Sequence, residues 1–82
     1  TSSYYDGAAS NVYSKVVSRI NAYRPIVVSY NDGAGTNHCV CAYGYKTDSS
    51  NFNNSQFVCS NGWGGTMWVS ARYLYSSAWI NA

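Results

Sequence analysis

Charged side chains are scarce in this sequence: they make up 10% of its 82 residues, against about 25% in an average protein. The chain carries five basic and three acidic residues, which gives a net charge of +2. The basic residues are scattered along the sequence, whereas a nucleic-acid-binding domain gathers them into a patch or stripe. We therefore expect no nucleic-acid partner.

Long apolar runs are absent too. No stretch approaches the roughly 20 apolar residues that span a bilayer, and no charged segment followed by an apolar one opens the chain. We expect no membrane partner, and we place any signal peptide upstream of Thr1. The polar surface must come from Ser, Asn, Thr and Tyr, a composition that favours a secreted, extracellular protein of bacterial type.

The three cysteines are an odd number, and Cys39 and Cys41 are too close along one strand to bridge comfortably. A disulfide framework is therefore not expected, and nor is a cofactor. A metal site would need this pair, Cys59 and one more ligand. Unpaired cysteines more often pack as small hydrophobic side chains, so we expect three free thiols on the sheet face opposite His38, with no metal.

The pattern of apolar residues predicts the order of helix and strands. Spacings of three and four predict an amphipathic helix over residues 12–23, with Ser10 or Asn11 as its N-cap. Residues 1–9 show no period, and residues 71–82 fit either a turn of helix or a last strand. Pro25 separates the helix from β-branched and aromatic runs, which predict strands over residues 26–30, 38–45, 56–60 and 67–70.

These elements predict an α+β fold, in which one N-terminal amphipathic helix is followed by a small, curled antiparallel sheet. Hydrophobic residues make up 46% of the chain and aromatic residues 17%, which is enough for a globular protein. A chain of 82 residues supplies one core at most. No repeat or linker divides it, so residues 1–82 are expected to form a single domain or a half-domain.

Two short motifs carry the functional interpretation. The only histidine, His38, opens a strand within the run TNHCVCAYGY at residues 36–45, and the run NGWGG follows at residues 61–65. A helix that passes through Arg24 and Pro25 into a Val-rich strand precedes both motifs. In this order and spacing, residues 12–70 resemble the C-terminal half of a papain-like cysteine peptidase. In that family a His opens a strand ending in Gly-Tyr, and Asn-Ser-Trp-Gly follows the next strand.

The resemblance implies the sheet lobe of a papain-like fold, with His38 as general base and Asn61 orienting the imidazole. Trp63 would cover their hydrogen bond with an apolar ring and exclude water from it. The implied reaction is the hydrolysis of peptide bonds in a peptide or protein substrate, through an acyl-enzyme.

The resemblance also implies a missing partner. The family's nucleophilic cysteine lies near the start of a helix in the N-terminal half, and no such segment precedes Val12. We therefore expect the nucleophile on a further segment or chain, and we expect this chain alone to be inactive. The exposed lobe surface would be covered by that partner, by a second copy of the chain, or by residues 1–9 folding back.

A second resemblance leaves an alternative open. The run MWVSARYL at residues 67–74 resembles the closing Gly-Trp-Val-Ser-x-x-Tyr-Leu of bacterial SH3-like wall-binding modules. It covers eight residues and accounts for neither the helix nor His38. On this interpretation the chain is a non-catalytic module that binds cell wall or peptide.

Overall fold

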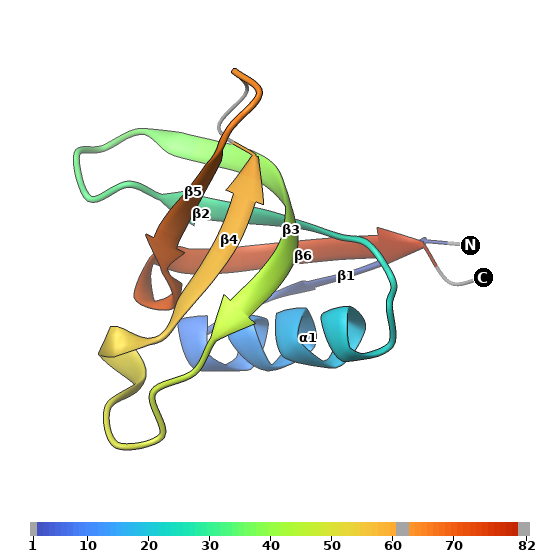
Figure 1. The fold of residues 1–82 in the computed structure, drawn as a ribbon, viewed down its shortest axis with the longest axis horizontal. Helices are drawn as coiled ribbons and strands as arrows, with labels where there is room; N and C mark the ends of the chain where they lie inside the picture. Colours follow the sequence, from blue (N-terminus) through green and yellow to red (C-terminus); the bar gives the residue numbers. More distant parts are fainter. Residues whose placement is uncertain (1, 61–62, 81–82) are drawn as a thin grey trace.

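The computed structural model describes residues 2–60 and 63–80, which form one α-helix packed on a six-stranded antiparallel sheet (Figure 1). The helix is α1 (Ala9–Asn21), and two 3-10 turns are η1 (Phe52–Asn54) and η2 (Ala71–Tyr73). The strands are β1 (Ser2–Asp6), β2 (Ile26–Asn31), β3 (Asn37–Lys46), β4 (Gln56–Ser60), β5 (Thr66–Ser70) and β6 (Leu74–Ile80).

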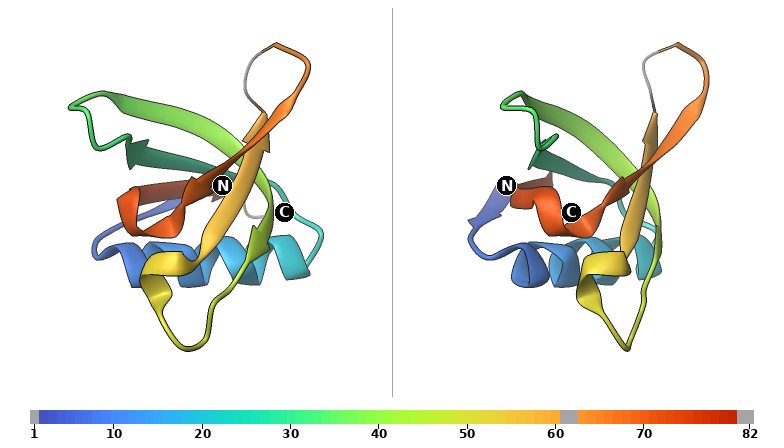
Figure 2. Two further views of the ribbon diagram at one scale, coloured as in Figure 1. Left: turned by 60° about the vertical axis from the view of Figure 1, so that its left-hand side comes forward. Right: turned by 90° about the vertical axis from the view of Figure 1, so that its left-hand side faces the viewer.

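The sheet order is β1-β6-β2-β3-β4-β5, and every neighbouring pair is antiparallel. The predicted α+β class is confirmed. The sheet is twisted and open, with β1 and β5 at its two ends; it is not strongly curled, which differs from the curled sheet that was predicted. Two further views show α1 along one face of the sheet, while β4 and β5 extend away from the helix (Figure 2).

The helix forms because one stripe of its surface is apolar. Val12, Tyr13 and Val16 are buried at spacings of one, three and four residues. The predicted N-cap is wrong: the helix begins at Ala9, and Ala8 occupies the cap position without a side-chain hydrogen bond. Alanine is the best helix former, and Ala9 packs against the core, so the helix gains a turn before Val12.

The C-terminal end of the helix has an unusual residue. Tyr23 has a φ of 56°, in the left-handed region where glycine is usual. Its backbone N–H donates to the Ile20 carbonyl, and the Arg24 N–H donates to the Arg19 carbonyl. This pair of bonds is a Schellman motif, and it turns the chain into Pro25 and β2.

The N-terminal strand was not predicted. Residues 1–9 were expected to lack an element, yet β1 pairs with β6, with Ser2 opposite Ile80 and Asp6 opposite Ser76. The run SSYYD has no alternation of apolar and polar residues, so only its distant partner strand makes it a strand. Because β1 and the β4–β5 pair lie at opposite edges of the sheet order, this segment does not fold back over the motif residues.

The core lies between α1 and the sheet. Phe57 of β4 is fully buried, and so are Val12 and Val16 of the helix and Val28 of β2.

The C-terminal segment was predicted to be either a turn of helix or a last strand. It contains both, because the 3-10 turn η2 is followed by strand β6. No helix within the described ranges is long and apolar enough to cross a membrane.

Strand β3 links the two parts of the sheet. Its first half pairs with β2, from Asn37 opposite Asn31 to Ala42 opposite Ile26. Its second half pairs with β4, from Ala42 opposite Cys59 to Lys46 opposite Gln56, with an irregularity between Ala42 and Gly44. The start of β3, where His38 lies, therefore pairs with β2.

Candidate functional site

His38 is the second residue of β3 and lies opposite Tyr30 of β2. The two rings stack, with centroids 5.1 Å apart and planes inclined by 24°. Side chains alternate along a strand, so His38 shares its face with Val40 and with the buried Ala42. The imidazole therefore lies at the rim of the core-facing side of the sheet.

The hydrogen-bond partner of His38 is Asp32, in the turn between β2 and β3. Asp32 Oδ2 lies 3.0 Å from His38 Nε2. Asp32 Oδ1 accepts from the backbone N–H groups of Ala34 and Thr36, at 2.8 and 3.2 Å. The hydrogen bond from His38, and then the one from Ala34, hold the pKa of Asp32 below its ordinary value. An ionised carboxylate only accepts hydrogen bonds, so Nε2 carries the proton.

Sequence reasoning missed Asp32, although a signal was present. The loop between the two strands contains Asn, Asp and Gly, whose turn chemistry was recognised, but no contact across the hairpin was inferred. The carboxylate reaches His38 because Gly33 and Gly35 adopt φ of 81° and 90°, which glycine adopts without steric cost. The loop thereby curls the Asp32 side chain back toward β3.

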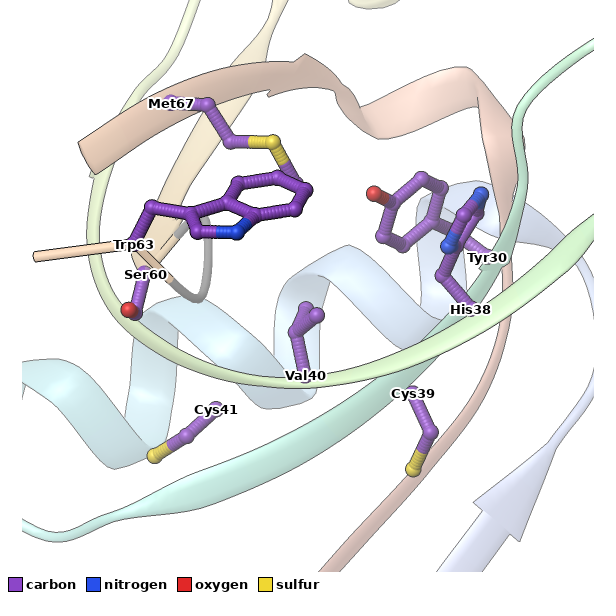
Figure 3. Close-up of a pocket in the computed structure, with 8 residues that line it drawn as sticks. All are labelled: Tyr30, His38, Cys39, Val40, Cys41, Ser60, Trp63 and Met67. Carbon is purple, nitrogen blue, oxygen red and sulfur yellow. The ribbon is translucent and has the colours of Figure 1, made fainter. Parts of the chain in front are cut away.

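A hollow of about 560 Å³ lies beside His38. Tyr30 and His38 stand on one side of it, Trp63 and Met67 stand on the other, and Val40 of β3 lies between them (Figure 3). Ser60 also lines it. Trp63 is 90% exposed. The β4–β5 hairpin and the start of β3 thus face each other across an open, largely apolar depression.

Tyr30 is a second residue that the sequence did not single out. It is 4% exposed and packs edge-on against Phe57, with ring centroids 5.6 Å apart. Burial, and then the nearby Cys59 and Asp32, raise the pKa of Tyr30 above its ordinary value. A neutral phenol therefore presents its hydroxyl to the hollow (Figure 3), and its ring stacks against the imidazole of His38.

Asn61, the predicted orienting residue, lies outside the described residues, and so does the predicted hydrogen bond between it and His38. Its neighbours Ser60 and Trp63 are described, and both line the hollow that contains His38. The chain therefore brings His38 and Trp63 to one depression from segments that are 25 residues apart in the sequence.

The three thiols are free, as predicted, but they do not share one face. Cys39 and Cys41 are exposed and also line the hollow, but their sulfurs lie on the opposite side of β3 from the Val40 side chain (Figure 3). Cys59 is fully buried in the core, because its register partner Ala42 faces the helix. The prediction that all three lie opposite His38 is thus wrong for Cys59. Burial, and then Cys41, raise the pKa of the Cys59 thiol.

This arrangement also argues against the alternative in which Cys39, Cys41 and Cys59 together bind a metal ion. Within residues 2–60 and 63–80, no group of three or more His, Cys, Asp or Glu side chains could hold a metal ion.

Comparison of the chain with protein-family models, curated proteins and solved structures gave no match.

Proposed function

We propose that this chain is the histidine-bearing part of a papain-like thiol peptidase. The observation that supports the proposal most is that His38 and Trp63, from the two sequence motifs, line the same hollow. The hollow is open and bordered by apolar side chains, which suits an extended peptide better than a small polar ligand. The resemblance in the motifs suggests the reaction class, and the hollow that His38 and Trp63 share is the observation that supports it.

In the proposed reaction, a cysteine thiol on a further segment or chain gives its proton to His38, and the thiolate sulfur attacks the peptide carbonyl carbon. The imidazolium then gives that proton to the leaving amine, which leaves a thioester. Water hydrolyses the thioester and restores the thiol. Since Nε2 of His38 faces Asp32, Nδ1 is the nitrogen with a free lone pair for the thiol proton.

The cysteines of this chain do not fill the role of the nucleophile. Cys39 and Cys41 point away from His38 (Figure 3), and Cys59 is buried in the core. A thiolate is the reactive form, and burial disfavours it at Cys59 by raising the pKa. The proposal therefore requires a partner segment or chain that docks on the hollow.

The gene sequence upstream of the codon for Thr1 provides the experiment. The proposal expects a Gln followed after a few residues by a Cys at the start of a helix. The product that contains both parts should hydrolyse casein, and a thiol-alkylating reagent should abolish the activity. The variant His38→Ala should lower kcat/KM at least about a hundredfold, whereas Lys46→Ala, far from the hollow, should not. Full activity in His38→Ala would refute the proposal.

A binding module without catalysis is the second candidate. The 90% exposure of Trp63 favours it, because exposed aromatic residues often serve as binding contacts. This candidate would be supported over the peptidase if the gene product binds peptides or cell wall and hydrolyses neither, and if Trp63→Ala lowers its affinity.

A further inference from the structure

Strand β5 forms one edge of the sheet. Within the described ranges, the sheet order ends with β5, which pairs with β4 alone. An edge strand leaves a row of backbone N–H and C=O groups unpaired, and proteins usually protect such an edge with charged side chains, proline or a bulge. The run TMWVS of residues 66–70 contains neither a charge nor a proline, and its register with β4 runs without a shift. The edge therefore has none of these protections.

The register of the β4–β5 pair shows which backbone groups face outward. Ala71, directly after β5, donates its N–H to the Ser55 carbonyl at 2.8 Å. These two residues continue the register in which Gln56 lies opposite Ser70, so they form a hydrogen-bonded pair. Hydrogen-bonded and non-hydrogen-bonded pairs alternate along an antiparallel ladder. Residues 67 and 69 therefore bond to β4, and residues 66, 68 and 70 turn their N–H and C=O groups outward.

The central residue of this edge is also a large, exposed aromatic one. Trp68 is 51% exposed. Its neighbours Met67 and Val69 pack against the core, and side chains alternate along a strand, so Trp68 lies on the face of β5 away from the core. A further strand at this edge would gain both backbone hydrogen bonds and an apolar contact.

The edge is complementary to itself. If two copies of β5 pair antiparallel about a twofold axis at Trp68, this residue faces its own copy, and Thr66 faces Ser70 of the other copy. Each outward-facing residue then lies opposite another outward-facing residue, so that their N–H and C=O groups can bond reciprocally. A shift of the register by one residue would remove this match. No like charges face each other, because β5 carries none.

We propose that β5 is an interface between two copies of this chain, which pair antiparallel at Trp68 and form one continuous sheet. The two copies are related by a twofold axis, so the same edge serves both. One edge of five residues buries less than a standard interface of about 1,600 Å², so the dimer is weak and forms with rising concentration. The inference is independent of the peptidase proposal, because it does not involve His38.

Cross-linking tests the register. Trp68→Cys, in a chain that also carries Cys39→Ser and Cys41→Ser, should form a covalent dimer under mild oxidation. The Cα atoms of a hydrogen-bonded pair lie about 5.5 Å apart, which suits a disulfide. Thr66→Cys in the same background should not cross-link, since its copy lies four residues away in the register. Tyr4→Cys, at the centre of the other edge strand β1, should not cross-link either. Equal cross-linking of all three variants would overturn the proposal.

Charge pairing keeps the test independent of how any single variant folds. In sedimentation the wild type should show a monomer–dimer equilibrium between about 10 μM and about 1 mM, and Tyr4→Lys should match it. Trp68→Lys and Trp68→Glu should each weaken association, because like charges would face each other. A mixture of these two variants should associate at least about tenfold more tightly than either alone. A wild type that stays monomeric up to about 1 mM, or a mixture no tighter than its components, would overturn the proposal.

Discussion

Asp32 Oδ2 and His38 Nε2 lie 3.0 Å apart across the β2–β3 turn, so a carboxylate six residues earlier in the sequence orients the only imidazole of the chain. The papain-like resemblance assigns that role to Asn61 instead. If Nδ1 of His38 takes the thiol proton, Asp32 and Asn61 would both have to accept a hydrogen bond from Nε2. The two orienting residues are therefore alternatives, and they can be separated by mutation.

The first prediction is that Asp32→Asn releases the His38 ring without unfolding the turn. The amide oxygen of Asn still accepts from the N–H groups of Ala34 and Thr36, but its NH₂ group cannot accept from His38 Nε2. The ring N–H proton should be visible by NMR in the wild type and exchange rapidly with water in the variant. Its assignment is unambiguous because the chain has one histidine.

Asp48→Asn is the matched control, since it removes the same charge from a different loop. Asp48 interacts with Ser50, Asn51 and Asn54, and the His38 proton should be unaffected by its loss. If the proton is lost in Asn61→Ala and persists in Asp32→Asn, Asn61 is the orienting residue and the role inferred for Asp32 is wrong.

The second prediction concerns acid. Hydrogen bonds from His38 to Asp32 and from Ser50 to Asp48 are the largest causes that hold the pKa values of both carboxyls below their ordinary value, about 3.9 in an unfolded chain. Above the pKa of the unfolded chain, each carboxylate contributes its full stabilisation to the fold. This stabilisation is lost as the pH falls through the lower pKa of the folded state. The free energy of unfolding in urea should therefore decrease below about pH 4.

The double variant Asp32→Asn, Asp48→Asn should flatten this dependence. Asn does not titrate, so the variant should lose less stability than the wild type between neutral pH and acid. Identical acid dependence of the two proteins would mean that other groups, and not these hydrogen-bonded carboxylates, control acid unfolding.

The third prediction is that Tyr23→Gly stabilises the chain by about 0.5 to 1 kcal/mol. Tyr23 has a φ of 56° and is 98% exposed, so its truncation loses little packing and relieves the left-handed backbone. The larger freedom of Gly in the unfolded chain offsets part of the gain. Tyr23→Ala keeps the backbone penalty, and urea unfolding should show no comparable gain for it.

Much of the fold follows from local sequence because its elements are strongly patterned. The apolar stripe of α1 and the β-branched run after Pro25 each predicted the correct element, and β4 was predicted with its observed bounds. The segment β1 could not be predicted, since Tyr4 and Tyr5 show no alternation and its pairing partner β6 lies some 70 residues away. Pairing over such a distance is a property of the whole chain.

The site was accessible from the sequence only in part. A single histidine at a loop–strand boundary drew attention to His38, and its motif partner Trp63 lines the same hollow. Asp32 and Tyr30 contact His38 because of how β2 and β3 are aligned in the hairpin. Tyr30 lies directly opposite His38, and Asp32 bonds to it from the turn. That alignment depends on the length of the turn and on the backbone conformation of its glycines, and neither follows from amino-acid composition.

The fourth prediction contrasts two buried serines. Ser77 is 1% exposed, and its hydroxyl has no hydrogen-bond partner among the described residues. Ser55 is fully buried, and its hydroxyl accepts from the Asp48 N–H at 3.0 Å. Ser77→Ala should therefore stabilise the chain by about 1 kcal/mol, and Ser55→Ala should destabilise it by about as much. Equal effects of the two variants in urea unfolding would contradict this.

The last prediction is that this chain alone has an ordinary pattern of thiol reactivity and no peptidase activity. An acyl-enzyme needs a thiolate within reach of the imidazole. The exposed Cys39 and Cys41 point away from His38 (Figure 3), and Cys59 is fully buried. Iodoacetamide should label two thiols at the rate of a free cysteine, and His38→Ala should not change that rate. Hydrolysis of a peptide substrate, or rapid labelling of one cysteine that His38→Ala slows, would place the nucleophile within this chain and remove the need for a partner.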